Sequence, residues 1–528
     1  MTWIFPQGNT LGILNIIAHF SVRLVVTLWL AAHAVAAESL ETPVAKFTLD
    51  AAVRQALAQS PALRIEEAEI DRREGVREQA AGEFDWRTSA GASRIKERSP
   101  LVDPLGRDAI TTGDTTAYSV SASRKLRNGV IVHPSAEVGV VGREAPAAPT
   151  FGSAQLNLQI IVPLLRGLGS ESTGAAEAAA RGDAEVARLL YRHALSTQAF
   201  AIARGYWTAR AAHAALLVRQ DDERRAQRLH EGIRVLVDAR VFAPNLLLQS
   251  EANLRQKSTS SQQSELSALD AGFQLSRAMG LKSTDMVQAP TPDQALPVAI
   301  AVADQKPSAE MRLRWINRAY GKRADYLATR QSEVPLRVLT RQAELDLRPR
   351  VDLSVRGGYS GLHQGESLFA PLTQRLTGLN GEVGVALEWP SANTYQHGVV
   401  RSRRATQRQA ELLTAQAQID IAADVCTALE EVRLRAATMR NAAATVAIAR
   451  QAVDQEQRRL QTGEASVLDV INLENLLSSA RLSEIDAQSG YAIAVARLRF
   501  SVGEIFTTDQ PDKSFQLSDL STPPADEK

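Results

Sequence analysis

The sequence has few of the residues that mark several common classes of protein. Its 528 residues include a single cysteine, Cys426, so it can form neither an intramolecular disulfide nor a metal site built on cysteine pairs. Aromatic residues make up only 5%, and the formal net charge is +1. Proteins that bind nucleic acid usually have a basic face, and this charge gives no sign of one. With 45% hydrophobic and 23% charged residues, the composition is that of a folded protein.

Long hydrophobic runs are absent after residue 40. A helix that crosses a bilayer needs about 20 mostly apolar residues, and the rest of the sequence has no such stretch. If the mature protein spans a membrane, we therefore expect it to do so as a β-barrel. Before residue 40, Arg23 precedes an apolar run at 24–32 and small residues at 34–37. This order predicts a signal peptide at residues 1–37; an uncleaved membrane anchor is the alternative.

The chain contains two copies of one plan. Residues 243–254 align with residues 465–476 without a gap, and with a one-residue shift the match extends to Gly280 and Gly503. The stretch between the copies is a predicted linker, because it holds four prolines. The sequence thus divides into a first repeat at residues 38–281, a linker at 282–308, a second repeat at 309–506 and a C-terminal tail at 507–528.

Each repeat contains segments in which apolar and polar residues alternate, which predicts strands at about 85–162 and 350–390. Segments of about 8 to 12 residues are near the ~9–11 that a tilted barrel strand needs. The side chains predicted to face lipid are Leu156, Leu158, Ile160, Val383, Val385 and Leu387. The alternation by itself also fits a soluble sandwich with one buried face. Asn128-Gly129 lies between alternating runs and predicts an additional hairpin in the first repeat.

Two proline-free stretches predict helices of unusual length. Residues 175–240 and 395–462 would each be about 100 Å long at ~1.5 Å per residue. The helices at 244–280 and 466–502 would return antiparallel after short turns. Apolar residues at heptad spacing predict two seams, at Ala187, Leu190, Ala194 and Thr197, and at Ile419, Ala422, Cys426 and Leu429. A hairpin this long cannot cover its seams alone, so we expect other copies beside it. A free-standing coiled coil is the alternative, but it leaves the strands unexplained.

Several segments resemble the outer membrane efflux protein (TolC) family. The resemblance covers about residues 47–506. Four segments carry it: the opening helix at residues 47–63, the link between barrel and long helix at 162–169, the turn at the periplasmic tip at 463–470 and the final helix at 491–499. In the opening helix, Ser60 replaces the usual Asn.

Membership of that family implies an α+β membrane protein. Its outer-membrane β-barrel, shared by a homotrimer with four strands from each subunit, continues into a long antiparallel α-helical coiled-coil periplasmic barrel. The function implied is a passive exit duct of a tripartite efflux pump or type I secretion system. Partners would be outer-membrane lipid, a periplasmic adaptor protein and an inner-membrane transporter. A non-pore periplasmic or secreted coiled-coil scaffold is the alternative.

The resemblance also implies a gate at the periplasmic tip, where carboxylates on the inner helix narrow the tunnel. Gly463 would form the tip turn, Asp469 matches the first carboxylate position, and Asn472 stands where a second Asp is typical. The alternative is that Asp469 is an ordinary helix-start carboxylate, favoured by the helix dipole. In the first repeat, residues 241–243 replace the expected glycine-containing turn.

No other motif indicates chemistry. His230-Glu231 lacks the second histidine of a zinc-binding helix. Residues 167–170 lack the third glycine of a nucleotide-binding loop. The sequence therefore predicts no catalytic residue, no cofactor and no metal site.

Overall fold

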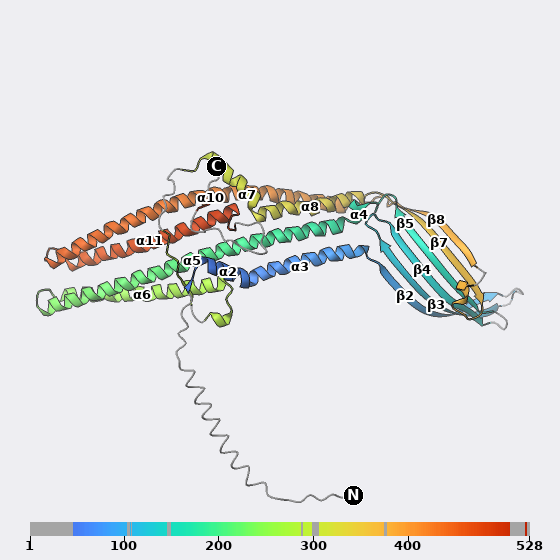
Figure 1. The fold of residues 1–528 in the computed structure, drawn as a ribbon, viewed down its shortest axis with the longest axis horizontal. Helices are drawn as coiled ribbons and strands as arrows, with labels where there is room; N and C mark the ends of the chain where they lie inside the picture. Colours follow the sequence, from blue (N-terminus) through green and yellow to red (C-terminus); the bar gives the residue numbers. More distant parts are fainter. Residues whose placement is uncertain are drawn as a thin grey trace, which may run out of the picture.

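A computed structural model describes residues 46–102, 106, 108–144, 149–286, 289–297, 306–373, 377–506 and 523–524. The predicted signal peptide and nearly all of the predicted tail lie outside these residues. The molecule is elongated, with a β-sheet at one end and helices along the rest of its length (Figure 1). Among the described residues, no helix combines the length and the apolar character needed to cross a membrane.

Two long helical hairpins form the end opposite the sheet (Figure 1). In the first repeat, α5 (Ala175–Asp238) is followed by α6 (Asn245–Ala278); in the second, α10 (Thr394–Gln461) is followed by α11 (Val467–Val502). Since α5 has 64 residues and α10 has 68, each is about 100 Å long at ~1.5 Å per residue. The turns of both hairpins lie at the same tip of the molecule (Figure 1).

Two shorter helices precede the strands in each repeat. They are α2 (Leu49–Gln59) and α3 (Pro61–Ala81) in the first repeat, and α7 (Ala309–Lys322) and α8 (Ala324–Leu345) in the second. Helix α3 packs against α5, and α8 packs against both α5 and α10. The order of helices, strands, long helix and returning helix is therefore the same in both repeats.

The repeats end at two equivalent glycines. Gly280 follows α6 with φ +69° and Gly503 follows α11 with φ +80°, a region that favours glycine. A Cβ on Gly280 would lie 3.0 Å from the Cα of Ser60, between α2 and α3. A Cβ on Gly503 would lie 2.8 Å from the carbonyl carbon of Lys322, at the end of α7. Each glycine thus closes its repeat against the break between the first two helices, which confirms the alignment of these positions.

Each repeat has its own apolar core where its helices meet. The first core joins α2, α5 and α6 through residues such as Val53, Tyr206 and Leu275. The second core joins α7, α8, α10 and α11 through residues such as Trp315 and Tyr491. Ala492 and Ala496 of α11 belong to the first core, so the two repeats are packed together. A two-residue strand, β6 (Thr291–Pro292), pairs in parallel with β1 (Lys46–Phe47) and ties the linker to the first repeat.

The predicted helix seams are only partly buried within the single chain. Leu190 and Ile419 are exposed, and Thr197 is exposed as well. Ala187 and Leu429 are already buried within this chain. Within this chain the buried positions of α10 are instead Ile421, Val425, Ala428 and Val432. These helices have apolar residues on more than one face, so heptad spacing alone cannot select the face that packs inside the chain.

The sheet has six antiparallel strands in the order β2-β3-β4-β5-β7-β8. Their bounds are β2 Arg87–Val102, β3 Asp108–Lys125, β4 Ile131–Glu144, β5 Phe151–Pro163, β7 Arg350–Gln364 and β8 Thr377–Glu388. The resemblance implied four strands per subunit, and the additional predicted hairpin left six as the alternative; the described sheet has six. The additional pair, β3 and β4, is the hairpin predicted at Asn128-Gly129, where Gly129 has φ +95°.

The register gives the sheet one apolar and one polar face. Opposite residues of antiparallel strands project to the same side. Leu156 of β5 lies opposite Ala136 of β4 and Tyr359 of β7, and Tyr359 lies opposite Leu379 of β8. Asn157, on the other face, lies between Ser135 and Gly358.

Candidate functional site

Most of the apolar face of the sheet is uncovered in the single chain. Leu158, Val383 and Val385 are exposed, and the register puts them on the face of Leu156. The other predicted lipid-facing residues share that face: Leu156 and Leu387 are exposed, and Ile160 is half-buried. A contiguous exposed apolar surface of this kind marks an interaction with a membrane or a partner.

Tryptophans flank the apolar face on both edge strands, at the end nearest the helices. Trp86 directly precedes β2 and Trp389 directly follows β8, with exposed fractions of 51% and 73%. The guanidinium of Arg124 lies 5.9 Å from the centre of the Trp86 ring. Tryptophan is enriched where a membrane protein crosses from lipid to water. Both tryptophans are visible in the sequence, but the strand patterns did not reveal that they lie at the same end of the sheet.

A charged pair closes the other end of the apolar face. Arg94 of β2 and Asp114 of β3 form an ion pair of 2.6 Å on that face. The eight residues from Trp86 to Arg94 extend about 27 Å along the strand. A strand tilt of ~40° reduces this to about 20 Å across the membrane, close to the ~25 Å apolar band of outer-membrane barrels.

The turn between β3 and β4 is anchored on the start of the long helices. Arg127 donates two hydrogen bonds to the carboxylate of Glu177 on α5, at 2.8 and 2.9 Å. These bonds hold the pKa of Glu177 below its ordinary value. The backbone nitrogen of Gly169 donates to the carbonyl oxygen of Asn128 at 3.0 Å. Only glycine fits at position 129, because a Cβ there would lie 2.1 Å from the carbonyl oxygen of Gly167.

The tip turn of the second repeat has the predicted local geometry. Gly463 has φ +77°, and the backbone nitrogen of Glu464 donates to the carbonyl oxygen of Arg459 at 2.8 Å, as in a helix-ending glycine motif. Ser466 caps α11. In the first repeat Arg240 has φ +59° at the corresponding turn.

Asp469 is engaged in the start of α11. The backbone nitrogen of Asp469 donates to Ser466 Oγ at 3.1 Å, and Asp469 Oδ2 accepts from the backbone nitrogen of Ser466 at 3.2 Å. This reciprocal pair is a capping box. Hydrogen bonds from Ser466 hold the pKa of Asp469 below its ordinary value. Asp469 and Asn472 are both exposed, less than one turn apart.

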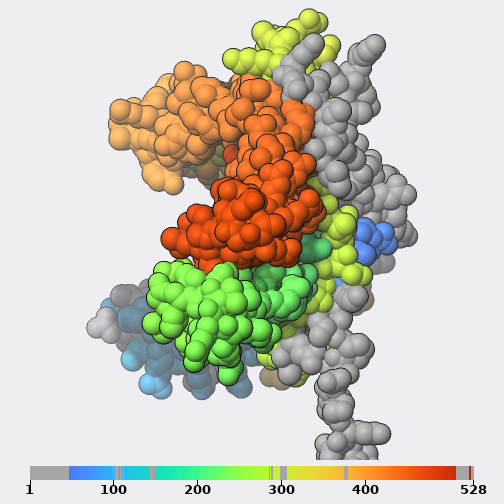
Figure 2. Space-filling model, turned by 90° about the vertical axis from the view of Figure 1, so that its left-hand side faces the viewer, coloured from blue at the N-terminus to red at the C-terminus, as the bar shows by residue number. Residues whose placement is uncertain are grey.

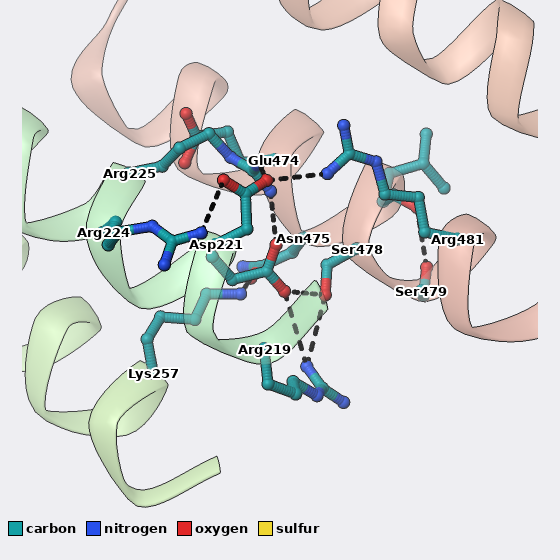
Figure 3. A network of polar contacts seen from close by, with 12 residues as sticks. Arg219, Asp221, Arg224, Arg225, Lys257, Glu474, Asn475, Ser478, Ser479 and Arg481 are labelled. Atoms are coloured by element: carbon teal, nitrogen blue, oxygen red, sulfur yellow. Dashed lines mark hydrogen bonds and ion pairs between the residues drawn. The ribbon is translucent and has the colours of Figure 1, made fainter. Parts of the chain in front are cut away.

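Above the tip, a network of polar side chains joins the two hairpins (Figure 3). Four of its members are almost fully buried, with exposed fractions of 3% for Asp222, 7% for Lys257, 6% for Glu474 and 1% for Ser478. Asp222 lies on α5, Lys257 on α6, and the other two on α11. Sequence reasoning missed this network, because its members come from three separate helices.

The contacts within the network cross from one hairpin to the other. Arg481 of α11 donates to Asp221 of α5 at 3.0 Å, and Lys257 of α6 donates to Asn475 of α11 at 2.6 Å (Figure 3). Asp222 accepts from Ser478 and forms an ion pair with Arg225. Buried charges are tolerated only when they are paired in this way.

Burial shifts the pKa of two members of the network. It raises the pKa of the Glu474 carboxyl above its ordinary value and lowers the pKa of the Lys257 ammonium. Glu474 accepts a hydrogen bond from the side chain of Gln457 on α10 at 3.1 Å. The network is therefore a candidate for pH-dependent contact between the hairpins.

Below the network, apolar side chains complete the contact at the tip. Ile233 of α5 forms a buried cluster with Val467 and Ile471 of α11. In Figure 2, which views the molecule from the tip, the orange-red hairpin α10–α11 lies directly against the green hairpin α5–α6. A cleft of 480 Å³ between them is lined by residues that include Leu229, Phe242 and Leu460. Among the described residues, no three His, Cys, Asp or Glu side chains gather as a metal site would require.

Comparisons with known proteins confirm the resemblance to the outer membrane efflux protein family. Residues 315–504 match the family described as "Outer membrane efflux protein". No curated protein sequence matches the chain.

Solved structures of outer-membrane channels share the fold of this chain. The CmeC channel of Campylobacter jejuni is similar with a TM-score of 0.65 and 12% identity, covering 86% of this chain and 85% of that one. VceC of Vibrio cholerae has a TM-score of 0.63 and 16% identity, with 86% and 96% covered. The open state of MtrE of Neisseria gonorrhoeae has a TM-score of 0.60 and 13% identity, with 86% and 89% covered. These likenesses show the fold: a sheet continued by long helical hairpins, in two repeats.

Proposed function

We propose that this chain, with the fold of the outer membrane efflux protein family, is one subunit of a homotrimeric outer-membrane exit duct. The duct would serve a tripartite efflux pump or a type I secretion system. The sheet would cross the outer membrane, and the helices would extend into the periplasm toward an adaptor protein and an inner-membrane transporter. The duct would be passive, without catalysis or a cofactor.

One observation carries this proposal: a sheet with an uncovered apolar face continues directly into helices about 100 Å long. The apolar face is bounded by Trp86 and Trp389 at one end and by the Arg94–Asp114 pair at the other. A soluble scaffold would cover such a face with its own chain, whereas here the described helix α9 (Ala370–Thr373) packs on it only at the ends of β5 and β7 farthest from the long helices, over Gly152 and Gly361. The helices provide the length for a conduit away from the membrane.

The surfaces that the single chain leaves open support the proposed oligomerisation. Strands β2 and β8 are the edges of the described sheet, and free edges invite pairing with another chain. Helix α10 exposes large apolar residues along much of its length, at Leu412, Leu413, Ile419, Leu434 and Ile448. We propose that neighbouring copies cover these edges and side chains. The predicted seam residue Ile419 would then pack between subunits.

We further propose that the tip is the gate and that the predicted strand residues face lipid. The exposed residues Asp469 and Asn472 would line the constriction, and Gly463 permits the turn that precedes them. The two repeats would span residues 38–281 and 309–506, on either side of the linker at 282–308.

The test is whether the mature chain forms a channel. Extraction of outer-membrane fractions with detergent should yield a trimer that dissociates on heating, and planar-bilayer recording should show discrete conductance steps. A stable, monodisperse monomer in buffer without detergent would overturn the proposal. So would a trimer that never conducts.

A further inference from the structure

We propose that the hairpin β3–β4 is an inserted part of the barrel wall, so that three copies close an exit barrel of 18 strands instead of 12. The inference rests on the proposed function, since it requires a barrel shared by three chains. It concerns the width of the solutes that the duct can release, which would be about twice the width that a barrel of four-strand subunits allows.

Comparison of the two repeats identifies β3 and β4 as the insertion. In the second repeat, β7 follows α8 and β8 leads to α10, so two strands connect the helices. In the first repeat, β2 follows α3 and β5 leads to α5, in the same relation to their helices. Strands β3 and β4 lie between β2 and β5 both in sequence and in the sheet. Without them, both repeats would have the same plan.

The inserted strands lie in the membrane-facing wall rather than across the opening. One row of opposite residues runs through all six strands: Ala90, Val120, Ala136, Leu156, Tyr359 and Leu379. Every member of this row is apolar, and the inserted strands provide Val120 and Ala136. A hairpin folded into the lumen as a plug would not continue the apolar face of its neighbours.

The inner turn of the insertion is fixed at the junction with the helices. Arg127 binds Glu177 on α5, and the hydroxyl of Thr173 donates to the carbonyl oxygen of Arg127 at 2.5 Å. Lys125 forms an ion pair of 2.6 Å with Glu83, next to the start of β2. The hairpin is thus held at the same level as the strands that lead into the helices.

On the polar face, the adjacent row consists of small uncharged residues. It contains Ser89, Ser121, Ser135, Asn157, Gly358 and Asn380. The hydroxyl oxygens of Ser89 and Ser121 are 2.8 Å apart and share a hydrogen bond. Such side chains project little into a lumen, so at this height the backbone sets its width.

Barrel geometry converts strand number into lumen size. With strands ~4.7 Å apart and a tilt of ~40°, the backbone radius is about 18 Å for 18 strands and about 12 Å for 12. Allowing about 5 Å for inward side chains leaves lumen radii of about 13 Å and about 7 Å. The open cross-section is then roughly threefold larger with the insertion.

Polymer exclusion in planar bilayers tests the width. A variant that lacks residues 106–144 removes β3 and β4 and leaves residues 103–105 and 145–150 as the connecting loop. Polyethylene glycols added at the barrel end should enter wild type up to a radius of about 13 Å and the deletion variant up to about half that radius. An unchanged cut-off in a conducting deletion variant would overturn the inference. If wild type does not conduct at all, the proposed function fails instead.

Cysteine labelling tests the same inference without a deletion. In a Cys426→Ser background, Ser121→Cys places a thiol on the polar face of β3, and Val120→Cys places one on the apolar face. A charged, water-soluble methanethiosulfonate should reduce the conductance of Ser121→Cys and leave that of Val120→Cys unchanged, if β3 lines the pore. Equal responses of the two variants would show that β3 is not part of the barrel wall.

Discussion

Ser478 on α11 donates its hydroxyl hydrogen to the carboxylate of Asp222 on α5, and this buried contact joins the two helical hairpins. Around it, Arg481 and Lys257 add charged contacts between the same hairpins (Figure 3). A buried network of this kind is satisfied in only one relative position of the helices. The hairpins are therefore held in register by polar contacts above the tip and by apolar packing at the tip.

Removing the hydroxyl should loosen the hairpins. Ser478→Ala leaves the buried Asp222 without one of its donors and should lower the free energy of unfolding of the helical region by about 1–3 kcal/mol. Thermal denaturation followed by helical circular dichroism measures the loss. Ser479→Ala is the matched control, because Ser479 is exposed and donates only to the carbonyl oxygen of Leu476 in its own helix. Equal losses in the two variants would show that the contact with Asp222 contributes nothing.

Glu474 should make the stability of the helical region depend on pH. Because burial raises the pKa of Glu474 above 4.5, the folded state binds more protons than the unfolded state just above that pH. The contribution of Glu474 to stability is thus fully present below pH 4.5 and falls as pH rises through the raised pKa.

Replacement of Glu474 by glutamine tests this dependence. Glu474→Gln keeps an acceptor for Gln457 and removes the titration. The variant should therefore melt at a higher temperature than wild type at pH 7, with the difference vanishing at pH 4. Glu464→Gln, at the exposed tip turn, should follow wild type at both pH values. A Glu474→Gln variant less stable than wild type at pH 7 would contradict the prediction.

The apolar face should tolerate no charge in the bilayer. Leu158→Arg should cost ~2–4 kcal/mol near the membrane centre and lower the amount of assembled trimer in the outer membrane. Asn157→Arg, one residue earlier on the polar face, is the control and should assemble normally. Quantitative gel analysis of unheated membrane fractions compares the two. Normal assembly of Leu158→Arg would place this face away from lipid.

The tip carboxylate should control block by multivalent cations. Three copies of Asp469 around one axis would attract cations from the periplasmic side. Asp469→Asn removes the charge and retains a side-chain acceptor for Ser466, so it should weaken the block and leave the trimer intact. Glu464→Gln removes the same charge from the turn and should change the block much less. The block is measured in planar bilayers. An unchanged block in Asp469→Asn would show that Asp469 only caps the start of α11 and does not form the gate.

Short-range features of the chain were predictable because their causes are local. Gly463 and Ser466 mark the reversal between α10 and α11, since a positive φ and a side-chain cap are properties of single residues. Asn128-Gly129 predicted the hairpin β3–β4 for the same reason. Alternation with period two predicted the apolar face that includes Leu158 and Val385.

Features that depend on which elements meet were not predictable in the same way. The sequence showed an additional hairpin, but pairing across the sheet made it part of a six-stranded wall. Heptad spacing placed Ile419 on a seam of α10 but could not show what would cover it, and packing within the chain buried Ile421 and left Ile419 exposed.

By itself, the sequence determined the two repeats, the long helices, the alternating strands and the residues that end each element, because each depends on neighbours a few positions apart. Only the tertiary structure decided which helix faces are buried and which charges are paired. Ser478 and Asp222 are 256 positions apart, and no spacing rule connects residues at that distance. Their contact exists because four helices from two repeats converge above the tip, and the desolvation of Asp222 there requires the donors that α11 and α5 bring to it.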